Sequence, residues 1–259
     1  MKKIIEITET TENDEKQLKD KIAPKAVGKL DMVIAFDTTG SMAAYIEDVR
    51  HQVAELIPRL FQDNDDLRLG IVAFGDYCDM KSKDDFGDAY QCIMPTDNEN
   101  DLVRFIRNSR DTSGGDGDEF YELVLKKIVD ETPWRPESTR SILLIADAHP
   151  HALGYSYGDF VQGNQIDWRH EARKAADRRI KVDTVTITGA SWYKELSAMT
   201  NGISVPFSSS QKTSELIYAS TMARGSMKQR ERFDQMRCCC MDAEMSEVLN
   251  SYSKAREED

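Results

Sequence analysis

The chain alternates between short apolar runs and polar, turn-forming stretches. Its three strongest apolar runs lie in Asp31–Asp37, Leu67–Asp76 and Ser141–His151, and each leads into acidic or glycine-containing residues. A short, nearly continuous apolar run that is rich in β-branched residues is typical of a parallel strand buried on both faces. The pattern therefore predicts three central strands with polar residues at their ends.

Apolar residues three or four positions apart follow most of these strands, which predicts helices. The first helical segment, Met42–Phe61, contains Pro58, which predicts a late kink or stop. The other expected helices are Asp101–Arg110, Phe120–Ile128, Trp168–Arg179, Ser191–Met199 and Lys212–Met222. Further strands are expected at Ala89–Met94, which we place at an edge, and at Ile180–Thr188 and Ile203–Phe207. This alternation predicts an α/β, doubly wound and Rossmann-like fold, with a mostly parallel sheet of about six strands and helices on both faces.

The two ends of the chain differ from its middle. Residues 1–27 are charged and poor in large apolar residues, so we interpret them as an N-terminal extension. Residues 226–259 carry an apolar stripe at helical spacing, which predicts a C-terminal amphipathic helix. That helix could fold back onto the domain, which we prefer, bind a partner, or drive self-association. Residues 28–225 form the predicted domain.

Oxygen-bearing side chains follow the three central strands. Asp37, Thr39 and Ser41 stand at alternate positions after the first, Asp76 follows the second, and Asp147 follows the third. The carboxyl ends of parallel strands meet at one rim of the sheet, so these side chains should converge there. Hard divalent cations take oxygen ligands. We therefore expect a site for Mg²⁺, or alternatively Mn²⁺, at this rim.

The segment Asp37-x-Thr39-x-Ser41 resembles the D-x-S/T-x-S signature of the von Willebrand factor type A (VWA) domain and its metal-ion-dependent adhesion site (MIDAS). The resemblance covers about residues 28–225, and Asp147 stands where the family has its second aspartate. It implies a mostly non-enzymatic module that captures an acidic side chain of another protein through the bound cation.

The loop between these two motifs departs from the common family pattern. Many members have Gly-Gly-Thr there, and the threonine reaches the metal, whereas here Gly114-Gly115 are followed by Asp116. A Gly-Gly-Asp resembles the branch of the family whose domains accompany atypical α-kinases, and residues 166–187 strengthen that comparison. The predicted metal ligands are therefore Asp37, Thr39, Ser41, Asp116 and Asp147.

Three further residues are second choices as ligands, namely Thr112, Asp76 and His149. His149 and His151 follow Asp147 closely, so they could add nitrogen ligands that favour Mn²⁺ or Zn²⁺. They could also act as an acid–base pair in hydrolysis, although hydrogen bonding of a loop is the commoner role of such histidines.

Composition narrows the class of protein. The net charge of -12 argues against a nucleic-acid-binding protein, which would need a basic face. No apolar run reaches the length of a membrane span, and the N-terminus lacks the apolar core of a secretory signal. Three of the five cysteines, Cys238–Cys240, are adjacent and form a poor disulfide framework, which indicates a reducing compartment. We expect a cytoplasmic protein.

These observations favour an intracellular metal-dependent protein-binding module that is not an enzyme and whose partner supplies an Asp or Glu to the metal. No P-loop or kinase signature is present, so an associated ATPase or kinase activity would reside on the partner. One alternative is a metal-dependent hydrolase acting on phosphoesters. Another is a structural, self-associating scaffold protein in which the metal only stabilises the fold.

Overall fold

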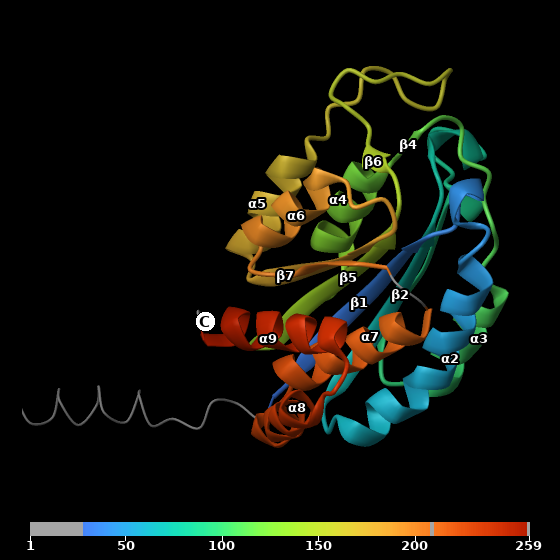
Figure 1. Ribbon diagram of the computed structural model, residues 1–259. Coiled ribbons are helices and arrows are strands. Elements are labelled where there is room, and N and C mark those ends of the chain that lie inside the picture. The colour runs from blue at the N-terminus through green and yellow to red at the C-terminus, as the bar shows by residue number, and fades with distance from the viewer. Residues whose placement is uncertain (1–27, 208–209, 258–259) are drawn as a thin grey trace, which may run out of the picture.

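A six-stranded sheet forms the centre of the computed structural model, which describes residues 28–207 and 210–257. The strand order is β3-β2-β1-β5-β7-β8 (Figure 1). The strands span Leu30–Asp37 (β1), Leu67–Phe74 (β2), Tyr90–Thr96 (β3), Thr139–Ala146 (β5), Ile180–Thr186 (β7) and Ser204–Pro206 (β8). All neighbours pair in parallel except β3, which lies antiparallel to β2 at the edge. The predicted mostly parallel sheet and its edge strand are confirmed; the expected N-terminal extension, residues 1–27, lies outside the described residues.

Strand β1 lies between the two hydrophobic layers of the core, and all eight of its residues are buried. Met32, Ile34 and Phe36 face the layer that contains α2, α3 and α7, whereas Val33 and Ala35 face the layer that contains α4, α5 and α6. Figure 1 shows these two helical layers on opposite sides of the sheet. The helices span Ile46–Asp63 (α2), Glu99–Asn108 (α3), Tyr121–Glu131 (α4), Trp168–Asp177 (α5), Ser191–Met199 (α6) and Ser210–Arg224 (α7).

Short elements connect the strand ends to these helices. Two 2-residue strands, Asp118–Glu119 (β4) and His149–Pro150 (β6), pair with each other in parallel beyond the end of the main sheet. Single 3₁₀ turns span Gly40–Met42 (η1), Tyr77–Asp79 (η2) and Gly87–Ala89 (η3).

Helix α2 differs from its prediction at both ends. It begins at Ile46 rather than Met42, because Gly40–Met42 forms a 3₁₀ turn first. It also continues through Pro58 to Asp63. Pro58 has no backbone N–H, so the helix lacks one hydrogen bond there. The neighbouring Ile57 and Leu60 are fully buried, and their packing stabilises the helix at this point.

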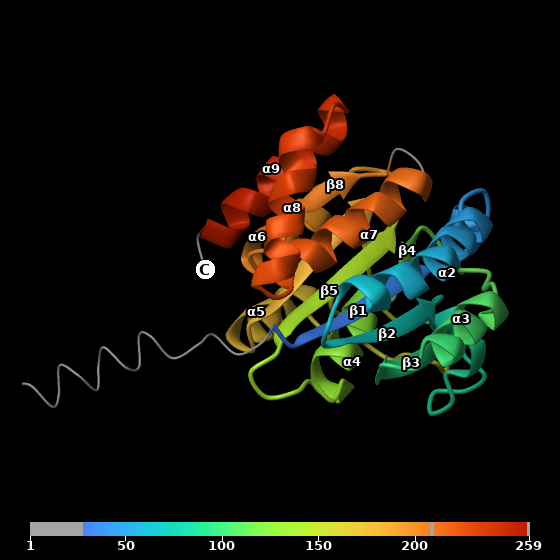
Figure 2. The same ribbon diagram turned by 90° about the horizontal axis from the view of Figure 1, so that it is seen from below.

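The C-terminal segment forms two helices, α8 (Met227–Cys239) and α9 (Ala243–Glu257), so the prediction of one helix was wrong. The break has a local cause, because Asp242 Oδ1 accepts a hydrogen bond from Met245 N at 2.8 Å and so caps a new helix. Both helices lie against α7 (Figure 2), and Phe233, Leu249 and Tyr252 are buried there. The apolar stripe therefore folds back onto the domain. Among the described helices, none is both long enough and apolar enough to cross a membrane.

A buried ion pair fastens this C-terminal part to the sheet. Arg224 at the end of α7 donates a hydrogen bond to Asp183 of β7 at 2.6 Å, and Tyr252 of α9 donates another at 2.8 Å. Burial alone would raise the pKa of Asp183, but the Arg224 charge and these hydrogen bonds outweigh it and lower the pKa. Asp183 therefore joins three elements as a carboxylate.

Candidate metal centre

The turn after β1 folds its own hydroxyl groups around a buried carboxylate. Asp37 is the last residue of β1 and is fully buried. Its Oδ1 accepts hydrogen bonds from the backbone N–H and from the hydroxyl of Thr39, both at 2.7 Å. The Thr39 hydroxyl lies 3.2 Å from the hydroxyl of Ser41. Three oxygen-bearing side chains from one turn therefore form a single cluster.

Asp147 joins this cluster from the neighbouring strand. Strand β5 pairs directly with β1, so the ends of the two strands lie side by side. The hydroxyl of Ser41 donates a hydrogen bond to Asp147 Oδ1 at 3.1 Å. The expected convergence of Asp37, Thr39, Ser41 and Asp147 on one rim is therefore observed.

Tyr121, which was not predicted from the sequence, connects the end of β1 to the residues that follow β5. Its hydroxyl donates a short hydrogen bond to Asp37 Oδ2 and accepts one from the backbone N–H of Ala148 at 3.1 Å. The side chain is buried and stacks on Trp192. Nothing in the sequence distinguishes this tyrosine from an ordinary core residue at the start of a helix.

Glu119 is the second residue that sequence reasoning missed. It is 3% exposed, and its Oε2 is buried without a hydrogen-bond partner among residues 28–207 and 210–257. Burial, together with the nearby charges of Asp37 and Asp76, raises the pKa of Glu119 to about 9. In the sequence, Glu119 is visible only as an acid just before an apolar helix. Asp116 and Asp118 stand beside it, and the pattern does not show which of these acids is buried.

The glycine-rich loop between these elements is tied down by Asp79, a third residue that sequence reasoning missed. The carboxylate of Asp79 accepts hydrogen bonds from the backbone N–H groups of Ser113, at 2.8 Å, and Gly114, at 3.1 Å. Gly114 has φ +70°, and a Cβ there would lie 2.8 Å from Glu119 Oε1. Glycine is therefore required at this position, both for the backbone conformation and for the close approach.

Acidic groups dominate the electrostatics of this rim. Burial raises the pKa of Asp37 to about 7, and burial also raises the pKa of Asp147. Above the cluster lies an open cleft of about 640 Å³, and the described residues that line it include no lysine or arginine. The lining residues are Ser41, Ser113, Gly114, Gly115, Asp116, Gly117, Glu119, Asp147, Ala148, His149, Thr188 and Ala190.

A divalent cation fits this arrangement. The donor atoms are hydroxyl and carboxylate oxygens, which are the ligands that hard cations prefer. Glu119 Oε2 has no hydrogen-bond partner among the described residues, and burial raises the pKa of Asp37, so a nearby positive charge would stabilise both acids as carboxylates. A cation at the cluster would supply that charge.

Asp116, the predicted middle-loop ligand, is exposed on the cleft wall. Its carboxylate accepts hydrogen bonds from the Tyr155 hydroxyl at 2.9 Å and from the Asp118 N–H at 3.0 Å. The alternative residue, Thr112, has its hydroxyl 3.0 Å from that of Thr38. Whether Asp116 or Thr112 reaches the cation stays a prediction.

The other two second-choice ligands, His149 and Asp76, lie in different surroundings. His149 is exposed and lines the cleft beside Asp147. Asp76 is fully buried, and its Oδ1 lies 2.7 Å from His151 Nε2. The two histidines therefore occupy different environments, and His151 pairs with Asp76 rather than with His149.

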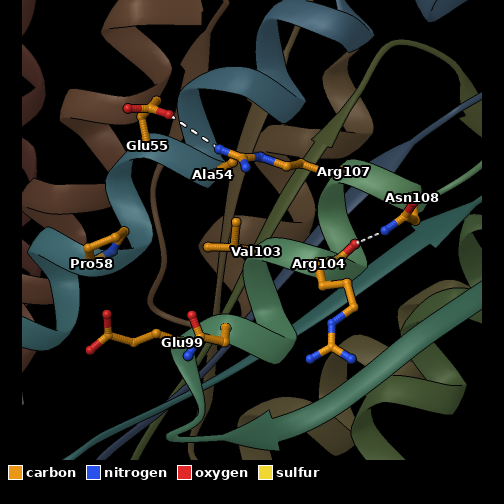
Figure 3. Close-up of a pocket in the computed structure, with 9 residues that line it drawn as sticks. Ala54, Glu55, Pro58, Glu99, Val103, Arg104, Arg107 and Asn108 are labelled. Carbon is orange, nitrogen blue, oxygen red and sulfur yellow. Dashed lines mark hydrogen bonds and ion pairs between the residues drawn. The ribbon is translucent and has the colours of Figure 1, made fainter.

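A second cleft, of about 470 Å³, lies between α2 and α3 (Figure 3). Arg107 reaches across it to Glu55 at 3.5 Å, and Asn108 donates a hydrogen bond to the carbonyl of Arg104. Among the described side chains that line this cleft, none leaves a buried polar atom without a partner. Nothing in this cleft points to a ligand, in contrast to the rim.

Comparison with known proteins places residues 31–221 of this chain in one family. The model of the von Willebrand factor type A domain matches residues 31–221. The chain is 32% identical over 130 residues, 49% of its length, to an α-protein kinase, vwkA, of Dictyostelium discoideum. It is 24% identical over 185 residues, 67% of its length, to a putative ariadne-like RING finger protein of Acanthamoeba polyphaga mimivirus. These matches cover 19% and 18% of the two relatives, so the chain spans about a fifth of their length.

Among solved structures, the chain is similar to proximal thread matrix protein 1 from the mussel byssus. The TM-score is 0.55 at 13% sequence identity, and the match covers 75% of this chain and 46% of the mussel chain. At this identity the similarity concerns the fold alone.

Proposed function

The chain belongs to the von Willebrand factor type A domain family, and from this premise we propose that it is a metal-dependent protein-binding module that captures an acidic group of a partner protein through a divalent cation. The observation that carries the proposal is the hydrogen-bonded cluster of Asp37, Thr39, Ser41 and Asp147, of which Ser41 and Asp147 line an open cleft. The cation is Mg²⁺ or Mn²⁺.

The charge of the cleft explains why a cation is needed. A carboxylate that enters the cleft meets Asp147 and Asp116, and the described lining residues include no lysine or arginine to attract it. Like charges at short range repel each other, so the metal-free cleft disfavours an acidic partner. A bound divalent cation would reverse this preference, which makes partner binding conditional on the metal.

The residues of the cluster have different roles toward the cation. Thr39 and Ser41 offer neutral hydroxyl oxygens, so direct binding through them leaves the charge of the cation available to a partner. Asp37 and Asp147 would bind through water, since Mg²⁺ gives up its water reluctantly. When bound, the cation supplies a positive charge and an open coordination position. Tyr121 holds Asp37 in place, and Ser41 ties the turn to Asp147.

The similarity to the Dictyostelium α-protein kinase supports a place beside a kinase. The matched region is about a fifth of that protein, so the kinase activity named for the relative is not attributed to this chain. We propose that the module itself is not an enzyme and that it acts in the cytoplasm. The adjacent cysteines support a reducing compartment.

Labelled, C-terminally amidated decapeptide pools with Asp, Asn or Lys at a central position, and mixed uncharged residues elsewhere, test this function. The Asp pool should bind in Mg²⁺, lose binding in chelator, and fail to bind the Ser41→Ala variant, whereas the Asn pool should not bind. Ser41 is exposed, so this variant should fold. Preference for the Lys pool that persists in chelator would contradict the proposal. Steady hydrolysis of a generic phosphoester that is lost in Ser41→Ala would favour the hydrolase alternative.

A further inference from the structure

A second group of potential metal ligands lies on the other side of the glycine-rich loop. It comprises Asp76 after β2, Asp116 in the loop and His151 after β6, and one donor atom from each residue lies within 4.8 Å of the others. None of the three belongs to the D-x-T-x-S turn. The group combines an imidazole nitrogen with two carboxylates, which differs from the all-oxygen cluster around Asp37.

Asp76 leaves one oxygen of this group without a partner. The side chain is fully buried, and its Oδ1 faces His151 Nε2, but its Oδ2 has no hydrogen-bond partner in the part of the chain that the structure describes. A Cβ built on Gly115 would lie 3.7 Å from that oxygen, so the loop that carries Asp116 passes directly over it. An unpaired buried carboxylate oxygen costs free energy unless a donor or a cation satisfies it.

His151 is held rigidly in position to act as a ligand. It is 2% exposed, and its ring stacks on that of Tyr155 with the centroids 3.7 Å apart. Its backbone N–H donates a hydrogen bond to the buried Glu122 at 3.1 Å, and Glu122 in turn accepts one from the Tyr77 hydroxyl at 2.8 Å. A fixed imidazole loses little entropy when it binds a metal.

We propose that Asp76, Asp116 and His151 bind a second divalent cation, of the Zn²⁺ class. One imidazole and two carboxylates are a ligand set that Zn²⁺ accepts, with a fourth position left for water. The cation would take the place of the direct contact between His151 Nε2 and Asp76 Oδ1. Asp116 is exposed and flanked by Gly115 and Gly117, and it closes the site from the loop side.

This site would stabilise the loop that borders the first cleft. Gly114 lies over Glu119 and Thr39, on the side of the first cluster, whereas Gly115 lies over Cys78 and Asp76. One loop thus separates the two groups, and a cation on Asp116 would fix the wall of the acid-binding cleft. Assigning Asp116 to the second cation leaves Thr112 as the candidate middle-loop ligand of the first. The two sites then share no ligand, so the second does not depend on the proposed function.

Zinc titration of the full chain tests this site. Calorimetry would be performed with Mg²⁺ in excess, on a background with Cys238, Cys239 and Cys240 replaced by serine, because these cysteines could bind Zn²⁺ themselves. We expect one Zn²⁺ per chain, and at least tenfold weaker binding in Asp116→Asn and in His151→Gln. Asp118→Asn is the matched control, since it removes one negative charge from the same loop outside the ligand group.

Asp116→Asn keeps the test decisive if the buried His151→Gln variant fails to fold, because Asp116 is exposed. X-ray absorption at the zinc edge should show nitrogen and oxygen neighbours at about 2.0–2.2 Å and no sulfur at about 2.3 Å. Three results would overturn the site: no saturable Zn²⁺ binding, equal binding in Asp116→Asn and wild type, or binding that Ser41→Ala abolishes. The last would place the zinc at the first cluster instead.

Discussion

The hydroxyl of Ser41 donates a hydrogen bond to Asp147 across 106 positions of sequence, at 3.1 Å. This contact exists because β1 and β5 are parallel neighbours and both end at the same rim. It places a neutral oxygen and a carboxylate from separate loops within reach of one ion, which is the geometric basis of the proposed cation site.

Replacing Tyr121 tests how Asp37 is held. In Tyr121→Phe the buried Asp37 Oδ2 loses its hydrogen bond, so the free energy of unfolding should fall by about 1–3 kcal/mol. Cation binding should weaken as well, because the lost bond normally lowers the pKa of Asp37. Urea unfolding and a Mg²⁺ titration measure the two effects.

Tyr193→Phe is the control for this variant. The Tyr193 hydroxyl donates a hydrogen bond to the carbonyl of Ala148, which also accepts one from the indole N–H of Trp192. The carbonyl therefore keeps a partner in Tyr193→Phe, and the free energy of unfolding should fall by less than in Tyr121→Phe. An equal fall in the free energy of unfolding in the two variants would show that the hydrogen bond to Asp37 stabilises the protein no more than the one to Ala148.

Trp192 should report binding of the cation by fluorescence. Its indole N–H donates to the carbonyl of Ala148 at 2.9 Å, one residue beyond Asp147, and its ring stacks on Tyr121. Adding Mg²⁺ or Mn²⁺ should therefore change the tryptophan emission, and Trp192→Phe should remove the change. Trp134→Phe should retain it, since Trp134 lies between α4 and the first residue of β5, at the end of that strand opposite Asp147. A cation signal that survives in Trp192→Phe would argue for a different binding place.

Glu119 should make the metal-free protein less stable as the pH rises. The folded-state pKa is about 9, whereas the ordinary value is 4.5, so the folded state keeps a proton that the unfolded state has lost. The stabilisation is complete below pH 4.5 and declines as the pH rises to about 9, with a slope of at most about 1.4 kcal/mol per pH unit.

Urea unfolding in chelator between pH 7 and 9 checks this prediction. In Glu119→Gln the decline should be shallower, because the remaining slope comes from other groups such as His151, whose pKa is also raised. Parallel pH profiles of the two proteins would refute the role of Glu119.

Replacing only one residue of the buried pair Asp183 and Arg224 should destabilise the protein strongly, whereas replacing both should destabilise it less. Arg224→Met leaves a buried carboxylate without its counter-charge, which should cost about 3–5 kcal/mol. The double variant with Asp183→Asn should recover part of that loss. Chemical denaturation of the single and double variants measures the coupling, and purely additive losses would mean that the two side chains do not act together.

The apolar pattern was sufficient to predict the sheet and most helices. Strand β1 is buried on both faces, so its apolar run is nearly uninterrupted, and α6 spans Ser191–Met199 as expected. The pattern did not predict the break in the C-terminal segment. An apolar stripe continues through the break, where residues 240–242 leave the helical conformation and the side chain of Asp242 caps α9.

The candidate site was predictable where a residue follows a strand directly. Asp37, Thr39, Ser41 and Asp147 occupy such positions, so strand topology alone brings them together. Glu119 lies in β4, Tyr121 begins α4 and Asp79 ends η2, and the placement of these residues at the rim depends on tertiary contacts. The pairing of Asp76 with His151 likewise depends on the crossing of loops that are distant in sequence, which local pattern does not encode.

The measurement that tests the cation site most directly is thermal unfolding, first in chelator and then with Mg²⁺, Mn²⁺ or Ca²⁺ added, for wild type and for Ser41→Ala. A cation that binds only the folded state stabilises it by about 2.7 kcal/mol at a hundred times its dissociation constant. We predict a higher unfolding temperature for the wild type in Mg²⁺ or Mn²⁺ and no such increase for Ser41→Ala. No increase with any cation, or an equal increase in both proteins, would contradict a cation held at Ser41 and its neighbours.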